Sequence, residues 1–394
     1  MKGSVHYEVR GASALLSIDN PPVNPLSSGV RQGLFDGMTQ ALDDDDIKTI
    51  VVTGLNRAFI AGADISEFGA AASEGAGLNQ VLDLMEGSTK PVIAAINGTA
   101  FGGGLEVALC CDYRVALATA PLGLPEVKLG LLPGAGGTQR LPRLIGAEAA
   151  IPMIISGNPV LAPAAFKLGI VDQVVDGNVV EAALTFAADL TGRGSPTRKI
   201  RDLSDKVLAD RNQADLFTKA AANLDKTHRG QFAPAQILKC IEAAVTLDDF
   251  EAGMAVERAC FAACLGDPQR EALIHIFFAE RAANKIPGLS KDMPLIDVQK
   301  AAVIGAGTMG GGIAMCFANA GIAVQLHDND PEGLKRGLKV IEGNYARTVA
   351  KGRLSQVAMD QRMALIEPAD SLEAFDQADV VVERVYENLD LKKE

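Results

Sequence analysis

The sequence predicts a chain of the α/β class, and its 394 residues favour two or three domains. Along the first half, strand-forming runs are each followed by a glycine-containing turn and a helix-like segment, a repeat that is typical of α/β domains. Strand signals fade after about residue 185, and residues 200–282 are rich in Ala, Leu, Lys and Glu, which favours helices. A further strand followed by a glycine-rich turn begins near residue 298.

The elements of the first half follow from the apolar pattern. Apolar residues partly alternate between Val5 and Ile18, as in strands, and Asn20-Pro21-Pro22 is expected to form a turn. The acidic run from Asp43 to Asp46 is interpreted as a solvated loop rather than a metal site. The other elements expected here are a helix over Leu26–Leu42 and buried strands over Thr49–Thr53 and Pro91–Ile96.

The second half begins with an expected linker over residues 283–297, which contains Lys285-Ile286-Pro287-Gly288. Later strands are expected over Ile322–Leu326 and Asp379–Val382. Residues 389–394 look helical and stop without a cap, which predicts that the chain ends inside a domain. The predicted divisions are 1–185 as the first core, 186–282 as its helical extension, 283–297 as the linker and 298–394 as an incomplete second α/β domain.

Composition excludes several classes of function. The net charge is −12, whereas a nucleic-acid-binding protein needs a basic face. A local cluster of Lys and Arg can still bind an anionic small substrate. No apolar run reaches the ~18–20 residues that span a membrane, and no signal peptide is recognisable. The six cysteines lack zinc-ligand spacing with histidines, so no metal site is predicted, and buried free thiols are favoured over disulfides.

A glycine turn that ends in a glutamate is the first candidate site. The expected strand before Asn97 leads into Gly102-Gly103-Gly104-Leu105-Glu106 and then an apolar helix over Val107–Cys110. Glycines at a helix start leave backbone N–H groups unshielded, and these favour negative charge. One such N–H could stabilise an enolate-type oxygen beside Glu106. The alternative is that Glu106 only complements the helix dipole and that the glycines only permit close packing.

A second carboxylate follows twenty residues later, in Gly123-Leu124-Pro125-Glu126. Pro125 fixes the backbone just before Glu126, and Leu132-Pro133-Gly134-Ala135-Gly136-Gly137 then opens another helix. By itself, Glu126 is more often a loop or capping carboxylate. Two carboxylates near one pocket favour chemistry instead, because one can stay ionised as a base while the other is held protonated as an acid.

These segments, together with Phe59-Ile60-Ala61-Gly62-Ala63-Asp64, resemble the enoyl-CoA hydratase/isomerase (crotonase) family in order and spacing, over roughly residues 5–185. The resemblance implies a crotonase fold of repeated β-β-α turns that binds acyl-CoA, with coenzyme A as part of the substrate. It implies an oxyanion hole formed by the backbone N–H groups of Ala63 and Gly103. It also implies that Glu106 and Glu126 are the two catalytic glutamates of the hydratases.

The expected reaction is a lyase reaction, the hydration of trans-2-enoyl-CoA to 3-hydroxyacyl-CoA. One alternative is an isomerase that moves a double bond from position 3 to position 2 in the same pocket. A different alternative is a non-catalytic fragment that binds CoA and NAD. Product analysis with a 3-enoyl-CoA separates the first two, and a steady-state hydratase assay separates both from the third.

A glycine fingerprint indicates a dinucleotide-binding (Rossmann) unit near residue 300. Gly305, Gly307 and Gly310 follow the β-rich run Ala302-Val303-Ile304 and precede a helix-like stretch over Ile313–Ala320. A second strand then leads to Asp328, 18 residues after Gly310. The three glycines allow the tight turn, the approach of a pyrophosphate and helix–strand packing, and the acid accepts from ribose hydroxyls, which favours NAD over NADP. His327 is interpreted as a packing or surface residue.

Residues 298–394 resemble the N-terminal part of the 3-hydroxyacyl-CoA dehydrogenase family, with a second match over Val381–Leu389. The resemblance implies that Glu387 and Lys392 lie near the cofactor, whereas Arg384 departs from the small residue usual there. It places the catalytic histidine–glutamate pair of this oxidoreductase beyond residue 394, so dehydrogenase activity is expected only in a longer chain.

Both halves together resemble the multifunctional enzymes of fatty-acid β-oxidation, to which the junction near Phe277–Arg281 is also similar. That resemblance implies self-association or a thiolase as a partner. It also implies a location in bacterial cytoplasm or, in a eukaryote, in the peroxisome.

Overall fold

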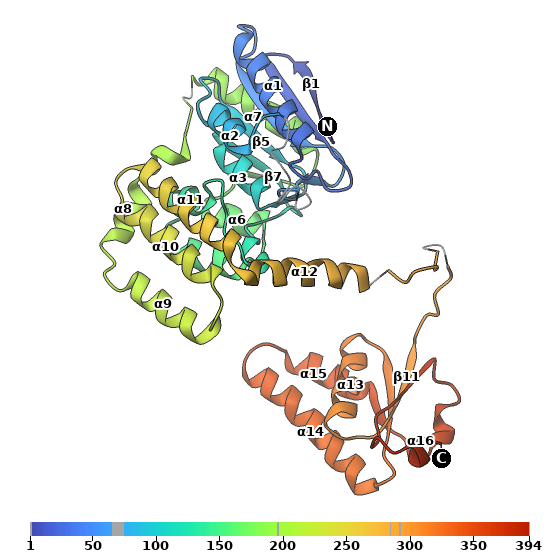
Figure 1. Ribbon diagram of the computed structural model, residues 1–394. Coiled ribbons are helices and arrows are strands. Elements are labelled where there is room, and N and C mark those ends of the chain that lie inside the picture. Colours follow the sequence, from blue (N-terminus) through green and yellow to red (C-terminus); the bar gives the residue numbers. More distant parts are fainter. Residues whose placement is uncertain (1, 65–74, 195–196, 284, 291–292, 394) are drawn as a thin grey trace. The chain divides into compact units, whose positions relative to one another are not determined.

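The computed structural model describes residues 2–64, 75–194, 197–283, 285–290 and 293–393. The chain divides into two compact units, Met1–Lys285 and Ile286–Glu394 (Figure 1). This division falls inside the segment 283–297 that the sequence predicts to be a linker. The finer boundaries stay predictions, and the one at residue 185 falls within a helix, α7 (Val179–Gly192).

The first unit is built on a six-stranded sheet with the order β1-β2-β3-β5-β7-β10. The first two strands are antiparallel and all other neighbours are parallel. Every residue of β3 and β5 is buried, as expected for apolar runs in the centre of a parallel sheet. The strands are β1 (Ser4–Arg10), β2 (Ser13–Asp19), β3 (Thr49–Gly54), β5 (Val92–Ile96), β7 (Tyr113–Leu117) and β10 (Gln173–Val175).

The two faces of this sheet bury different helices. On one face, Leu15, Val51 and Ile93 pack against Val179 and other residues of α7. Their sequence neighbours point to the opposite face because side chains alternate along a strand. That opposite face belongs to the main core of the unit, which also includes residues of α1 (Ser28–Asp43), α2 (Leu78–Glu86) and α3 (Gly103–Cys110).

A second, smaller sheet of the first unit carries the loops that matter for chemistry. Its order is β4-β6-β8-β9, with β4, β6 and β8 parallel and β9 antiparallel to β8. Short helices follow these strands and lead into the helical part of the unit. The elements are β4 (Ala58–Ile60), β6 (Thr99–Phe101), β8 (Pro121–Gly123), the 3-10 helix η2 (Glu126–Leu129), α4 (Gly137–Ile145), α5 (Ala147–Ser156), β9 (Val160–Leu161) and α6 (Ala162–Leu168).

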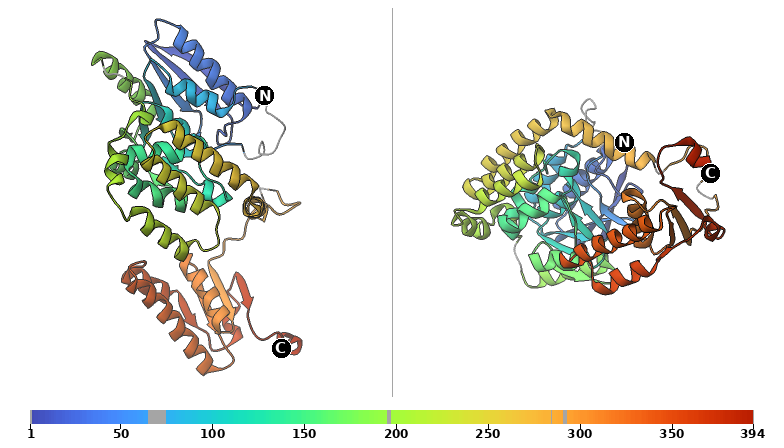
Figure 2. Two further views of the ribbon diagram at one scale, coloured as in Figure 1. Left: turned by 60° about the vertical axis from the view of Figure 1, so that its left-hand side comes forward. Right: turned by 90° about the horizontal axis from the view of Figure 1, so that it is seen from below.

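The helical expectation for residues 200–282 is met by a set of helices that completes the first unit. In this set α10 and α11 run side by side, and α10 also packs on α4 and α5 (Figure 2). The last helix, α12, buries none of its residues fully. The set comprises η3 (Ile200–Asp202), α8 (Asp205–Arg211), α9 (Leu216–Thr227), α10 (Ala233–Thr246), α11 (Phe250–Gly266) and α12 (Pro268–Ala283).

The second unit has a parallel four-stranded sheet with the order β13-β12-β11-β14. Its core lies between this sheet and the helices α13, α14 and α15. The elements are β11 (Lys300–Ile304), α13 (Thr308–Asn319), β12 (Ala323–His327), α14 (Pro331–Ala350), α15 (Gln356–Ala364), β13 (Ile366–Pro368), η4 (Leu372–Phe375), β14 (Val380–Glu383) and α16 (Leu389–Lys393).

The α/β class predicted from the sequence is confirmed, and the differences are local. The first long helix begins two residues later than expected, and α3 and α13 begin earlier, inside their glycine turns. All six cysteines are free, and five are buried, but Cys316 is exposed, so the expectation of buried thiols is wrong there. None of the helices within the described residues has the length and apolar composition needed to cross a bilayer.

Candidate active site

The glycine turn before α3 creates the first part of the site. Gly102 is the N-cap of α3 and has φ 54°, a left-handed conformation that favours glycine. A Cβ atom at this position would also lie only 2.9 Å from Oε1 of Glu126, so the turn and the second carboxylate are in direct proximity. Close approach of backbone and carboxylate therefore requires glycine at position 102.

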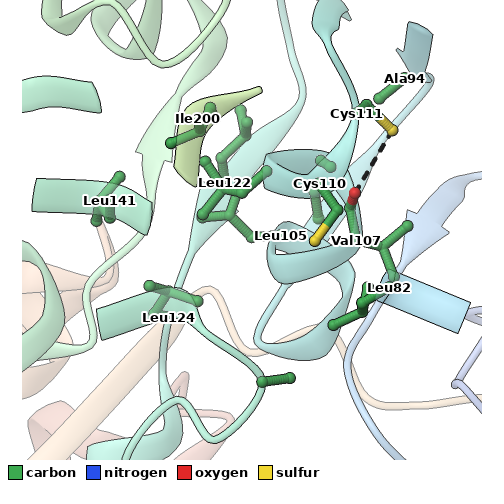
Figure 3. Close-up of a cluster of buried hydrophobic side chains, with 14 of the residues drawn as sticks. Leu82, Ala94, Leu105, Val107, Cys110, Cys111, Leu122, Leu124, Leu141 and Ile200 are labelled. Atoms are coloured by element: carbon green, nitrogen blue, oxygen red, sulfur yellow. Dashed lines mark hydrogen bonds between the residues drawn. The ribbon is translucent and has the colours of Figure 1, made fainter. Parts of the chain in front are cut away.

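Helix α3 is rigidly held because all eight of its residues are buried. Leu105, Val107 and Cys110 lie in an apolar cluster with Leu82 of α2 and Leu122 of β8 (Figure 3). The thiol of Cys111 donates a hydrogen bond to the carbonyl of Val107, at 3.4 Å between sulfur and oxygen. This packing fixes the direction of the first helical turn, from which Glu106 projects.

Glu106 is almost fully buried, with 3% of its surface exposed. Its Oε1 atom accepts hydrogen bonds from the backbone N–H groups of Ala135 and Gly137, both at 2.8 Å. Burial raises the pKa of Glu106, and these two N–H groups and the charge of Arg140 oppose that rise. The carboxyl is therefore oriented through one oxygen by the loop that precedes α4.

Glu126 begins the 3-10 helix η2 directly after Pro125. Its Oε2 atom is shielded from solvent and has no hydrogen-bond partner among the described residues. Burial, followed by the charge of Glu106, raises the pKa of Glu126 well above its ordinary value. A carboxyl in this environment is stabilised in the protonated form, which can act as an acid.

Gly103 lies beside the backbone nitrogen of Ala63. A Cβ built on Gly103 would be 3.7 Å from the backbone nitrogen of Ala63. Gly103 is the first residue of α3, so its N–H has no carbonyl four residues earlier in the helix to which it could donate. Ala63 is held by a parallel bridge to Leu26. The structure thus brings together all four residues that the sequence predicts for this site.

Sequence reasoning missed a further buried carboxylate beside this site, Glu257 of α11. It is fully buried and accepts hydrogen bonds from the N–H of Gly136 at 2.7 Å and of Thr138 at 3.1 Å. Burial, and then the charge of Glu106, raises its pKa to about 8. A usable signal was its spacing, because Glu257 shares the helical stripe of the buried residues Gly253, Met254, Cys260 and Cys264.

A buried ion pair lies beside these carboxylates. Arg140 of α4 donates from Nε and Nη2 to the two carboxylate oxygens of Glu86, at 2.8 and 2.7 Å. The same guanidinium donates from Nη1 to the carbonyl of Ala135, so it also holds the loop that binds Glu106. Such bidentate geometry is the strong form of the Arg–carboxylate pair.

The glycine fingerprint of the second unit has the geometry of a dinucleotide site. A Cβ on Gly310 would lie 1.8 Å from the carbonyl oxygen of Gly305, so the start of α13 packs directly on the turn. A Cβ on Gly307, the N-cap of α13, would meet nothing within 4 Å, which leaves the helix N-terminus open to a phosphate. Asp328 follows β12, and its Oδ2 accepts from the N–H of Ala306 at 2.8 Å. These residues fit NAD.

The other residues predicted near the cofactor pair with each other. Lys392 lies 2.9 Å from Glu387 and 3.3 Å from Glu383, which ends β14. The backbone of Arg384 reaches the glycine turn, because a Cβ on Gly305 would lie 2.7 Å from the Arg384 carbonyl oxygen. His327 is buried and hydrogen-bonds through both ring nitrogens, with the carbonyl of Ala369 and the side chain of Asn329.

Two family models match this chain. Residues 8–238 match the model described as "Enoyl-CoA hydratase/isomerase". Residues 300–394 match the model described as "3-hydroxyacyl-CoA dehydrogenase, NAD binding domain". The first match contains all four residues of the carboxylate site, and the second contains the glycine fingerprint and Asp328.

Curated relatives and solved structures agree with these matches. The "Peroxisomal bifunctional enzyme" of Cavia porcellus is 40% identical over 386 residues, covering 96% of this chain and 53% of its own length. An Arabidopsis thaliana "Peroxisomal fatty acid beta-oxidation multifunctional protein" is 35% identical and covers 100% of this chain and 56% of its own length. The chain thus spans about half the length of these curated relatives. A carnitinyl-CoA dehydratase from Mycobacterium avium shares 26% identity and a TM-score of 0.52, covering 70% of this chain and 96% of its own.

Proposed function

The chain belongs to the enoyl-CoA hydratase/isomerase family, and on this premise we propose that its first unit hydrates trans-2-enoyl-CoA to 3-hydroxyacyl-CoA. The observation that carries the proposal is the pair of glutamates, Glu106, which is buried, and Glu126, which is half-buried with its Oε2 shielded, beside the backbone of Ala63 and Gly103. Burial raises the pKa of both carboxyls, and the charge of Glu106 acts on Glu126 in addition. Two interacting carboxyls of unequal pKa supply an acid and a base in one pocket.

Each residue has a definite part in the proposed reaction. The N–H groups of Ala63 and Gly103 bind the thioester carbonyl oxygen and stabilise the enolate that develops there. Glu106, whose Oε1 is held by two N–H groups, takes a proton from water as the oxygen of that water bonds to the β-carbon. Glu126, whose pKa is held well above its ordinary value, delivers a proton to the α-carbon.

A crotonyl-CoA assay tests this proposal. Addition of the protein should remove the absorbance of the conjugated enoyl thioester, and the product should be 3-hydroxybutyryl-CoA. Absence of turnover would favour a non-catalytic fragment that binds CoA. An isomerase acting in the same pocket would convert a 3-enoyl-CoA to the 2-enoyl form, and product analysis with that substrate distinguishes the two activities.

For the second unit we propose NAD binding at Gly305, Gly307, Gly310 and Asp328. The open N-terminus of α13 would take the pyrophosphate, and Asp328 would accept from the ribose hydroxyls. Bound NAD supplies a hydride acceptor. Glu387 and Lys392 are proposed to lie near it, because Lys392 contacts Glu383 at the end of the strand beside the glycine turn. Dehydrogenase activity is proposed for a longer chain only.

The wider setting is fatty-acid β-oxidation, which is supported by the printed names of the curated relatives. Those names also support a peroxisomal location for a eukaryotic source, whereas bacterial cytoplasm stays a prediction. Self-association and a thiolase partner are likewise predictions, and size measurement by light scattering tests the former.

A further inference from the structure

The loop before α4 and the first two residues of that helix distribute four consecutive backbone N–H groups between two buried carboxylates, Glu106 and Glu257. The N–H groups of Ala135 and Gly137 donate to Oε1 of Glu106, at 2.8 Å each. Those of Gly136 and Thr138 donate to Oε1 and Oε2 of Glu257, at 2.7 and 3.1 Å. The hydroxyl of Thr138 also bonds Oε2 of Glu257. Because the donors alternate, neither carboxylate can shift without moving the segment that holds the other.

Helix α11 presses on this loop from the Glu257 side. A Cβ on Gly134 would lie 2.6 Å from the Phe261 ring, and a Cβ on Gly253 would lie 2.2 Å from Oε1 of Gln139. The opposite side of the loop is fixed by Arg140, which binds the carbonyl of Ala135 and pairs with Glu86. The loop is therefore held between α11 and the ion pair, and Glu257 accepts the hydrogen bonds that join this loop to α11.

We propose that Glu257 is a positioning residue for the hydration reaction: it holds the segment 134–138 so that two N–H groups orient the carboxyl of Glu106. This inference rests on the proposed function, since the orientation of Glu106 matters only if Glu106 reacts. Oε1 of Glu106 accepts both of these hydrogen bonds, so Oε2 is not engaged by the N–H groups of Ala135 and Gly137. Glu257 bonds to Gly136 and Thr138 and not to Glu106, so it holds Glu106 through this segment, while its charge also raises the pKa of Glu126.

A purely structural role for Glu257 makes different predictions from a positioning role. A structural carboxylate would contribute to the stability of the unit and leave the turnover of folded enzyme unchanged. A positioning carboxylate changes kcat while KM for the thioester stays constant, because it affects the reacting group and not the binding of the ground state. Its effect must also depend on Glu106, since residues that act through one group are not additive.

The test is a double-mutant cycle with crotonyl-CoA, using Glu257→Ala with and without Glu106→Gln. Alone, Glu257→Ala should lower kcat by about 10–100-fold, the scale of a misplaced catalytic group, with KM changed less than about twofold. In the Glu106→Gln background the same change should lower kcat less than about threefold. Glu257→Gln keeps one acceptor oxygen and should restore part of the loss. Glu242→Gln, an exposed change on the neighbouring α10, is the control and should have no effect.

Hydrogen–deuterium exchange of residues 134–138 gives a readout that does not require activity. Glu257→Ala should speed exchange of this segment about tenfold or more, because two N–H groups lose their acceptors. Unchanged exchange, or an equal loss of kcat in both backgrounds, overturns the positioning role. If the wild-type chain lacks hydratase activity, the proposed function fails and exchange alone decides whether Glu257 holds the loop. If Glu257→Ala does not fold, Glu257→Gln carries the same cycle.

Discussion

Replacement of Glu106 by glutamine is the sharpest test of the carboxylate pair. Glutamine has nearly the same shape, and its single carbonyl oxygen can accept both hydrogen bonds that Ala135 and Gly137 now donate to Oε1. The second oxygen becomes an NH₂ group, which cannot accept a proton from water. The substitution therefore removes the proposed base and leaves the loop contacts in place.

The expected loss follows from these contacts. General acid–base groups contribute about 10²–10⁴ in rate, so kcat should fall by that factor. At 1.36 kcal/mol per tenfold change, this is about 2.7–5.4 kcal/mol of lost transition-state stabilisation. Stability should change little, because both N–H groups keep an acceptor. Glu106→Ala would instead leave two buried N–H groups unpaired, at about 1–3 kcal/mol each.

The assay follows the absorbance of crotonyl-CoA at saturating substrate, with urea unfolding curves for wild type and both variants. Glu106→Gln should have the strongly reduced kcat given above and unchanged stability, and Glu106→Ala should have a similarly reduced kcat and lower stability. The same measurement on Glu126→Gln should give a comparable loss of kcat. If both glutamine variants keep near-full activity, the assignment of the pair is wrong.

Four further outcomes are expected. Gly103→Pro should lower kcat about 10²–10³-fold, because it removes one oxyanion donor at a helix position where proline is tolerated. A variant with an unchanged circular dichroism spectrum and full activity would contradict the oxyanion role. Asp328→Ala should weaken NAD binding about 10–100-fold in calorimetry, the scale of a hydrogen bond to a charged group, and equal affinity would place the ribose elsewhere. The folded-state pKa of Glu257 is about 8, above its ordinary value of 4.5, so the native state holds an extra proton between these values and the free energy of unfolding should fall as pH rises through that range. Urea unfolding at about pH 6 and about pH 9 should show this fall, and Glu257→Gln should reduce it. NADH should not form from 3-hydroxybutyryl-CoA. His327 is the sole histidine of residues 286–394, and both of its ring nitrogens are already hydrogen-bonded. Sustained turnover would mean that the second active site is misplaced.

The sequence predicts the strands and the glycine turns because these depend on local chemistry, whereas the residues of the carboxylate site were predicted from the family resemblance. The apolar runs of β3 and β5 and the φ requirement of Gly102 can be read from neighbouring residues alone. The raised pKa of Glu126 cannot be read in this way, since it arises from burial and from the charge of a residue twenty positions away. Glu257 is more remote still: its place on the apolar stripe of α11 indicates burial, but its partners lie 119 and 121 positions earlier in the chain and cannot be read from neighbouring residues.

The start of α13 illustrates the same limit in the second unit. The fingerprint predicts the turn and the acid at Asp328, and both are found where the spacing places them. The helix was expected only from Ile313, since glycines disfavour a helix interior, yet α13 begins at Thr308. Close packing of Gly310 on the Gly305 carbonyl explains the difference, because tertiary contact outweighs the propensity of single glycines.

The supports of the carboxylate site have a consequence for how this chain can be divided or recombined. The match to the hydratase family ends at residue 238, but Glu257 and Phe261 of α11 lie beyond it. Arg270 of α12 also lies beyond it and packs close to the end of η2, because a Cβ on Gly130 would be 2.9 Å from the Arg270 Cα. A gene fragment cut at residue 238 would encode Ala63, Gly103, Glu106 and Glu126 and lack the helices that brace them. Domain shuffling that preserves hydratase chemistry should therefore place its crossover after Ala283, so that the module is inherited together with its scaffold.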